Sequence, residues 1–297
     1  MEKLQEQVTA FLNELSEQQH LSVNTIDAYR NDIAQYMYFL SDQQGCSDWL
    51  RVDDLMVRKY FYWIQDQGSA AATVARKATA VRRFHRYLVS CHIRPDDPTY
   101  LMDTPKVTLH HLEVLSYPQI EQLLDAPDSG TATGCRDLAM LELLYATGMH
   151  VSELIQLNVN DVHLDMGFVH CGGKKGRERV LPIGKKAEAA LRHYIEDGRE
   201  NVPEDECALF VNRRCRRLSR QGIWKILKQY AAIAGINQQL SPETLRQSLA
   251  AHLLENGADV LSVEMLMGRT STLFAQRFSH TAKPLLKDFY RLYHPRA

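Results

Sequence analysis

The chain has 297 residues, of which 45% are hydrophobic and 24% charged, and its formal net charge is −1. This length is too great for one compact core and suits two domains of a globular protein. No apolar stretch approaches the ~18 residues of a membrane span, and the charged N-terminus is unlike a signal peptide, so we expect a cytoplasmic protein with no membrane partner.

The first part of the chain, residues 1–92, is predicted to be helical. It contains four stretches with apolar residues at helical spacing, over 2–17, 23–42, 52–66 and 71–90. The next segment, 93–113, holds Pro95, Pro98 and Pro105 in a mixed polar composition that is typical of an interdomain linker. We therefore expect an N-terminal domain over 1–92 and a second domain over 114–297.

The second part opens with a helix-start signal, because Ser116 is followed three residues later by Gln119 in a capping-box pattern. A helix is expected over 135–147, ending at Gly148. Residues 168–171 and 180–183 predict two strands on either side of a glycine-rich turn. Further helices are predicted over 184–197, 219–234, 242–256, 259–267, 271–279 and 284–293. The fold class is therefore mainly α with a small sheet.

Two basic clusters stand out against the near-zero net charge. The first, within 74–88, has no acid and contains Arg76, Lys77, Arg82, Arg83 and Arg86, which we expect to face outward from a helix. The second surrounds a helix start at Ser219 and contains Arg213, Arg214, Arg216, Arg217, Arg220 and Lys225. For a single cluster, a solvated surface is the slightly favoured interpretation. One cluster in each domain favours nucleic acid, because phosphates relieve the repulsion between like charges.

Several longer motifs resemble those of Xer-type tyrosine recombinases. LELLYATGMHVSELI at 141–155 resembles the family's LLYATGLRVSEL segment, and GGKKGRERVLPIG at 172–184 resembles its lysine-bearing β-hairpin. LSPETLRQSLAAHLLENGAD at 240–259, residues 263–280, the ending YHPRA, and NTIDAYRNDI and AVRRFHRYL in the first part agree as well. The resemblance covers nearly the whole chain. It implies a four-helix SAM-like core-binding domain and a mostly helical catalytic domain with a small antiparallel sheet, which bind double-stranded DNA.

The resemblance also implies a chemistry, in which a tyrosine hydroxyl attacks a phosphodiester. Two arginines neutralise the phosphate oxygens, a lysine protonates the leaving oxygen, and two histidines assist. In the family's order along the chain, the corresponding residues are His150, Lys174, Glu243, Arg246, Arg269 and Phe278. Lys174 and Arg246 match the family, whereas the other four positions differ.

Phe278 stands at the position of the nucleophile, and a phenyl ring has no nucleophilic oxygen. We therefore predict a DNA-binding protein that cannot cleave DNA. Ser279, Tyr290 and Tyr293 are the hydroxyl residues that would have to replace the tyrosine, and we expect none of them to do so. Glu243 lies in a first helical turn, where a carboxylate stabilises the helix through its dipole but would repel a phosphate. Its carboxylate can also pair with Arg246, Arg269 or Lys174.

Other polar and aromatic residues have structural interpretations. We expect Trp63, Trp224 and His252 to be packing residues, and the six scattered cysteines to be reduced, with no metal and no cofactor. The amphipathic C-terminal segment either packs on its own domain or docks onto a neighbouring protomer.

Three functions remain in competition. The first is an accessory or architectural DNA-binding protein that partners a sister recombinase, in chromosome-dimer resolution or on a mobile element. The second is an active recombinase with an unusual site, and the third is a protein-interaction scaffold that no longer binds DNA. The retained basic clusters argue against the third.

Overall fold

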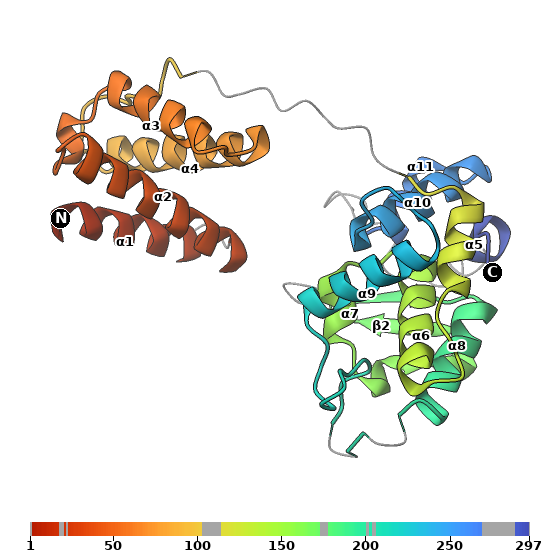
Figure 1. The fold of residues 1–297 in the computed structure, drawn as a ribbon. Coiled ribbons are helices and arrows are strands. Elements are labelled where there is room, and N and C mark those ends of the chain that lie inside the picture. The colour runs from red at the N-terminus through yellow and green to blue at the C-terminus, as the bar shows by residue number, and fades with distance from the viewer. Residues whose placement is uncertain are drawn as a thin grey trace. The chain divides into compact units, whose positions relative to one another are not determined.

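The computed structural model describes residues 2–17, 21, 23–102, 114–172, 178–199, 202–203, 206–268 and 289–296. The chain divides into two compact units, Met1–His110 and His111–Ala297 (Figure 1). Among the described helices, none is both long enough and apolar enough to cross a membrane.

The described part of the first unit contains four helices, as predicted. They are α1 (Glu2–Glu17), α2 (Val23–Gln43), α3 (Asp54–Asp66) and α4 (Ala71–Ser90), with a 3₁₀ turn at Trp49–Arg51. The third helix begins two residues later than the apolar pattern indicates. The cause is an N-cap, because the Asp53 carboxylate accepts a hydrogen bond of 2.8 Å from the Met56 N–H.

Aromatic side chains fill the core of this unit. Phe11, Tyr36, Trp49, Tyr60 and Phe84 are all buried. The Trp49 and Phe84 rings meet edge to face with their centroids 4.7 Å apart. Burying each such side chain contributes roughly 1.5–3 kcal/mol, so this cluster is the main source of stability in the unit.

The start of the expected linker packs on the first unit. Arg94 is 4% exposed, and its guanidinium donates to the carbonyl oxygens of Trp49 at 3.2 Å and Val52 at 3.1 Å. Thr99 is also buried. The packed part of the unit therefore extends beyond residue 92, where the proline content led us to expect a linker.

The second unit is mainly helical around a three-stranded antiparallel sheet. Within its described residues, the helices are α5 (Tyr117–Asp125), α6 (Ala132–Thr147), α7 (Val151–Gln156), α8 (Lys185–Glu196), α9 (Arg220–Ile233), α10 (Pro242–Glu255) and α11 (Val260–Leu266). Its strands are β1 (Val162–His163), β2 (Phe168–Cys171) and β3 (Arg179–Pro182), with 3₁₀ turns at Val159–Asp161 and Leu164–Met166.

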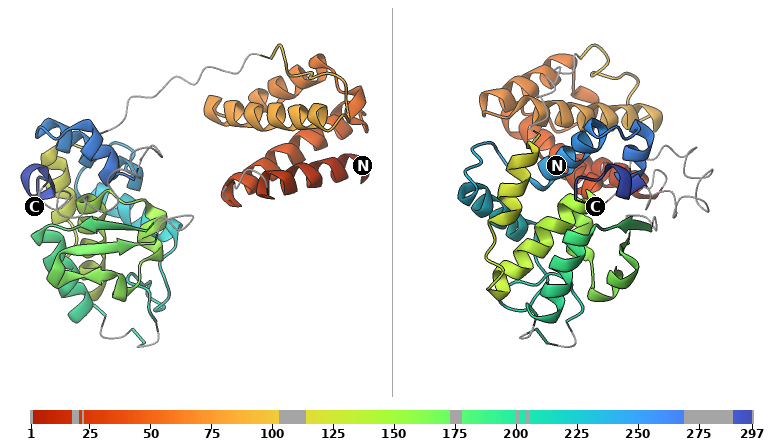
Figure 2. Two further views of the ribbon diagram at one scale, coloured as in Figure 1. Left: turned by 180° about the vertical axis from the view of Figure 1, so that it is seen from behind. Right: turned by 90° about the vertical axis from the view of Figure 1, so that its right-hand side faces the viewer.

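The sheet has the order β1-β2-β3, with Val169 opposite both Val162 and Leu181 (Figure 2). The two predicted strands are confirmed to within one residue. The sequence did not predict β1 and α7, because two and six residues are too few to show a period. The helix predicted at 271–279 and residues 284–288 of the helix predicted at 284–293 lie outside the described residues.

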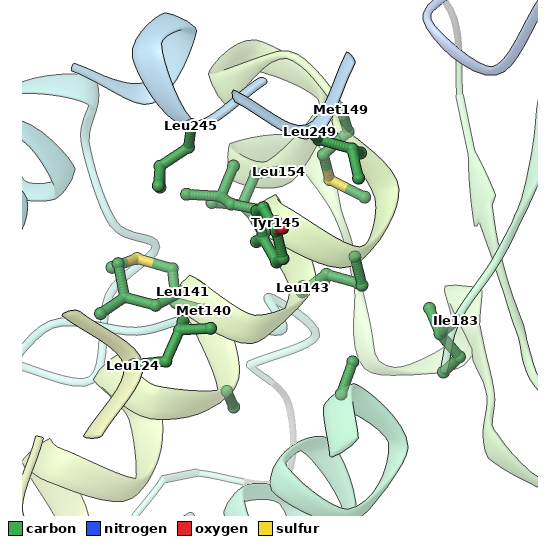
Figure 3. Close-up of a cluster of buried hydrophobic side chains, with 14 of the residues drawn as sticks. Leu124, Met140, Leu141, Leu143, Tyr145, Met149, Leu154, Ile183, Leu245 and Leu249 are labelled. Carbon is green, nitrogen blue, oxygen red and sulfur yellow. The ribbon is translucent and has the colours of Figure 1, made fainter. Parts of the chain in front are cut away.

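Helix α6 is the centre of the second core and packs against α8 and α10. Figure 3 shows part of this cluster, with Leu249 of α10 close to Met149. The Tyr145 hydroxyl lies 2.8 Å from Nδ1 of His252, which confirms that His252 is a satisfied structural histidine. The helix ends at Gly148 with φ of 57°, as predicted. A Cβ at Gly148 would also lie 2.9 Å from Cε of Met267.

Residues 289–296 pack on their own unit. The Tyr290 side chain is buried, and its hydroxyl oxygen accepts a hydrogen bond of 3.0 Å from the Gly184 N–H. The Arg296 guanidinium forms ion pairs with Glu142 and Glu121. Of the two arrangements expected for this segment, the structure therefore shows the self-packed one.

Candidate active site and basic clusters

Three helices begin around one cleft in the second unit, α7, α9 and α10. The cleft has a volume of about 540 Å³. Its lining residues include Met149, His150, Glu153, Arg179, Arg220, Trp224, Ser241, Pro242, Glu243, Met267 and Gly268. Because helix N-termini carry partial positive charge, this arrangement suits an anion.

Arg246 is hydrogen-bonded to Met267, one of the residues that line this cleft. Its side chain comes from α10 and the residue is only 3% exposed. The guanidinium donates to the carbonyl oxygens of Gly148, at the end of α6, and Met267, at the end of α11. These bonds fix the orientation of the one family arginine that the structure describes.

His150 lies on the cleft at the position of the other family arginine. Burial and the neighbouring charge of Arg246 lower the pKa of its imidazole, although Glu153 and Glu243 act in the opposite direction. At neutral pH the side chain is therefore uncharged. A neutral imidazole lacks both the permanent charge and the bidentate geometry of a guanidinium.

Glu153 and Arg179 form an ion pair that the sequence did not single out. Arg179 Nη2 lies 2.7 Å from the Glu153 carboxylate, and Arg179 Nη1 donates to the Leu266 carbonyl at 2.7 Å. Glu153 also accepts the His150 backbone N–H at 2.6 Å. Burial alone would raise the pKa of Glu153, but Arg179 and this N–H lower it. The carboxylate thus fixes the start of α7. The three-residue spacing of His150 and Glu153, which is that of a capping box, is the sequence pattern that could have predicted this role.

Glu243 lies in the first turn of α10, as predicted. The helix is capped by Ser241, whose Oγ accepts the Thr244 N–H at 3.0 Å. The Glu243 carboxylate therefore places a negative charge on the same cleft as the His150 imidazole. Lys174, Arg269, Phe278 and Ser279 lie outside the described residues.

Three aromatic residues were assigned roles from the sequence, Tyr290, Trp224 and Trp63. Tyr290 is 2% exposed, its hydroxyl is hydrogen-bonded to Gly184, and burial raises the pKa of that hydroxyl. It is therefore a packing residue rather than a nucleophile. Trp224, expected to be a packing residue, is instead 39% exposed and lines the cleft. Trp63 stacks on Tyr60, as expected of a packing residue.

The first basic cluster is not the continuous outward-facing set that we expected. Asp32, on α2 and 1% exposed, pairs with both Arg76 and Lys77, and Lys77 Nζ is 3.1 Å from its carboxylate. Arg82 donates to the Met102 carbonyl at 2.7 Å. Arg83 lies over the Tyr29 ring, 5.8 Å from its centroid. The negative charge that pairs with Arg76 and Lys77 comes from α2, so the sequence of 74–88 gives no sign of it.

Arg86 and most of the second cluster are exposed. The side chain of Arg86 is 71% exposed. Exposed members of the second cluster are Arg213, Arg214, Arg216, Arg220 and Lys225. Arg217 differs, because its guanidinium donates to the Ile155 carbonyl at 2.7 Å, the Leu157 carbonyl at 2.9 Å and the Asn158 side chain at 2.6 Å. Arg217 therefore holds the segment after α7 in place.

The comparisons with known proteins agree with this arrangement. Residues 113–284 match the phage integrase family, and residues 8–92 match the phage integrase N-terminal SAM-like domain. The chain is 41% identical to tyrosine recombinase XerD of Oceanobacillus iheyensis over 97% of both chains, and 39% identical to that of Halalkalibacterium halodurans over the full length of both. The fold matches a lambda integrase dimer bound to a COC' core site with a TM-score of 0.71 at 15% identity, covering 91% of this chain and 96% of that one. The chain is therefore a Xer-type member of the phage integrase family of tyrosine recombinases.

Proposed function

We propose that this chain binds double-stranded DNA as an accessory or architectural member of a site-specific recombination system and does not cleave it. The observation that carries the proposal is Phe278, which stands where the family has its tyrosine. Strand cleavage in this family forms a phosphotyrosine bond, and a phenyl ring has no oxygen with which to form it.

The charges of the cleft support the same conclusion. Negative charge accumulates on the phosphate oxygens in the transition state, and fixed donors must stabilise it. His150 supplies a neutral imidazole there and Glu243 a carboxylate. Losing one such donor typically lowers the rate by about 100- to 1000-fold. Restoring a hydroxyl at position 278 alone should therefore not restore efficient cleavage.

Binding is supported by the groups that remain. Arg213, Arg214 and Arg216 are exposed just before α9, and Arg220 begins this helix on the cleft. A row of guanidinium groups leading to a helix N-terminus is suited to successive phosphates. A structural relative was solved on its DNA core site. An accessory role implies a sister recombinase as the partner, and we place both proteins in the cytoplasm.

The relatives' printed name, tyrosine recombinase, favours a second candidate, an active enzyme with an unusual site. The test begins with selection of bound DNA from a random pool. The selected site is then synthesised with a nick that traps any covalent intermediate. We expect no covalent adduct with the unaltered chain. We also expect none with Phe278→Tyr alone, and an adduct when His150→Arg, Glu243→His and Arg269→His are added.

A covalent adduct formed by the unaltered chain would overturn the proposal in favour of the active enzyme. Ser279→Ala and Tyr293→Phe would then identify the attacking hydroxyl, with Tyr290→Phe as the control for a buried hydroxyl. Failure to retain mixed-sequence DNA in a gel shift even at low salt would instead support the scaffold.

A further inference from the structure

A thiol, an imidazole and a carboxylate form a hydrogen-bonded series in the second unit, and none of them lines the cleft described above. Sγ of Cys135 lies 3.1 Å from Nε2 of His193, and Nδ1 of His193 lies 2.7 Å from the Asp197 carboxylate. This is the arrangement of a nucleophile, a base and a group that orients the base.

The fold explains why these residues meet although 58 positions separate Cys135 from His193. Cys135 lies in the first turn of α6, and His193 lies in the last turn of α8, which packs against α6. Asp197 follows His193 by four residues and therefore lies on the same side of the helix, one turn on. The geometry is set by the largest helix–helix packing in the unit.

Asp197 raises the pKa of both the Cys135 thiol and the His193 imidazole. Burial and the charge of Asp197 raise the pKa of the Cys135 thiol, so the sulfur is protonated at neutral pH and needs a base. The protonated His193 ring donates hydrogen bonds to the Asp197 carboxylate and to the Ser129 carbonyl, which raises the pKa of His193 and makes its imidazole a stronger base. The Asp197 contact also directs Nε2 toward the sulfur.

Access to the sulfur is narrow. Cys135 is 5% exposed, and its thiol lies within hydrogen-bond distance not only of His193 but also of the Ser129 carbonyl oxygen in the loop before α6, to which it donates at 2.7 Å. A Cβ built on Gly198 would lie 3.2 Å from the Cβ of Cys135, so the space beside it is filled. The His193 side chain, in contrast, is 45% exposed. The imidazole is therefore the more exposed member of the pair.

We propose that Cys135 is a peroxide-reactive thiol, with His193 as its base and Asp197 as a positioning residue. The thiol proton passes to Nε2 of His193 while the sulfur attacks one peroxide oxygen. The S–O bond forms and the O–O bond breaks. The leaving hydroxide takes the proton from His193 and departs as water, so sulfur is oxidised to a sulfenic acid and the peroxide is reduced.

The other cysteines of the chain are internal controls. Cys171 on β2 is 1% exposed, and burial raises the pKa of its thiol to about 12. Cys91 is exposed. Exposure alone would make Cys91 more reactive than Cys135, whereas the proposed base predicts the reverse order. The chain also offers a control histidine, His170, which pairs with Glu178 at 3.3 Å.

The test uses the full chain with hydrogen peroxide at neutral pH, and traps sulfenic acids with dimedone. Mass spectrometry of the peptides gives a labelling rate for each cysteine. We expect Cys135 to be labelled faster than Cys91 and about 100-fold faster than Cys171, as general-base assistance allows. His193→Asn should slow the labelling of Cys135 about 100-fold, whereas His170→Asn should leave it unchanged. Equal rates for Cys135 and Cys171, or an unchanged rate in His193→Asn, would overturn the proposal.

Asp197→Asn distinguishes a positioning role from a packing role. It also replaces His193→Asn as the test if His193→Asn unfolds the chain. Faster labelling of the buried Cys171 would reveal such unfolding. The groups facing the pair are Asp197 and Glu196 on α8, with the Ser129 carbonyl and Asp128 from the loop before α6. His193 acts as a base only when its imidazole is unprotonated, and Asp197 raises the pKa of that imidazole. The labelling rate of Cys135 should therefore rise as the pH increases through this raised pKa. In Asp197→Asn this rise should move to lower pH and the plateau should fall. An unshifted pH profile would contradict the role given to Asp197.

Discussion

The division of the second basic cluster into exposed arginines and a structural one predicts two different defects. Replacing Arg213, Arg214 and Arg216 together by alanine removes three exposed guanidinium groups without disturbing a described packing contact. Each phosphate contact contributes about 0.9 to the slope of log K against log salt concentration. The slope should therefore fall by about 2.7. Between 50 and 200 mM salt, the unaltered chain should then lose about 40-fold more affinity than the triple variant.

Arg217→Ala should behave in the opposite way. Its guanidinium binds two backbone carbonyls and Asn158, and losing these bonds should cost about 2 kcal/mol of unfolding free energy. For a unit of this size, Tm should fall by roughly 4–8 °C. Gel shifts over a salt series and thermal unfolding measure both quantities. Arg192→Ala, which replaces a partly exposed arginine on α8 paired with Asp165, is the control for surface charge. An unchanged salt slope in the triple variant, together with a lowered slope and unchanged Tm in Arg217→Ala, would refute the assignment.

Three further predictions concern stability. Asp32→Asn should lower the unfolding free energy of the first unit by about 3 kcal/mol in urea denaturation, because it breaks a buried ion pair. The control is Asp27→Asn on the same helix, where the carboxylate is half-exposed and paired with Arg30. This control should change the unfolding free energy by less than about 0.5 kcal/mol. Burial and Arg94 lower the pKa of His85 to about 3, below its unfolded value, so its neutral form must be protonated as the chain unfolds. The first unit should therefore lose about 3 kcal/mol between pH 6.5 and pH 4, and His85→Gln should show a shallower dependence if this reasoning holds. Arg296→Ala should destabilise the second unit by about 3–5 kcal/mol, because Glu142 stays buried without its partner. Arg296→Ala with Glu142→Leu should recover much of that loss in thermal unfolding, and no recovery would count against a pairing effect.

Local patterns in the sequence predicted the helices well, because apolar periodicity and caps act over a few residues. The capping box at Ser116 is present, with its N–H donating to Gln119 at 2.9 Å. Elements shorter than two turns, such as α7 and β1, carry no period and were missed.

Pairings between distant residues could not be predicted in the same way. Asp32 and Arg76 lie 44 positions apart, so the counter-charge that holds Arg76 is absent from its own helix. The same holds for Glu153 and Arg179 at the cleft, 26 positions apart. The motif resemblance located the cleft residues His150 and Glu243, but it could not tell that the imidazole is neutral, because burial decides that.

The hydrogen bonds of Arg246 show that a residue that matches the family's catalytic position can also be needed for folding. Its guanidinium joins the last turns of α6 and α11, and losing it would leave two buried carbonyls unpaired, at about 1–3 kcal/mol each. Natural selection for folding alone would therefore keep this arginine in a lineage that never cuts DNA. His150 and Glu243 line the cleft, so their identities bear on the chemistry of this site more directly than an arginine whose bonds also serve folding.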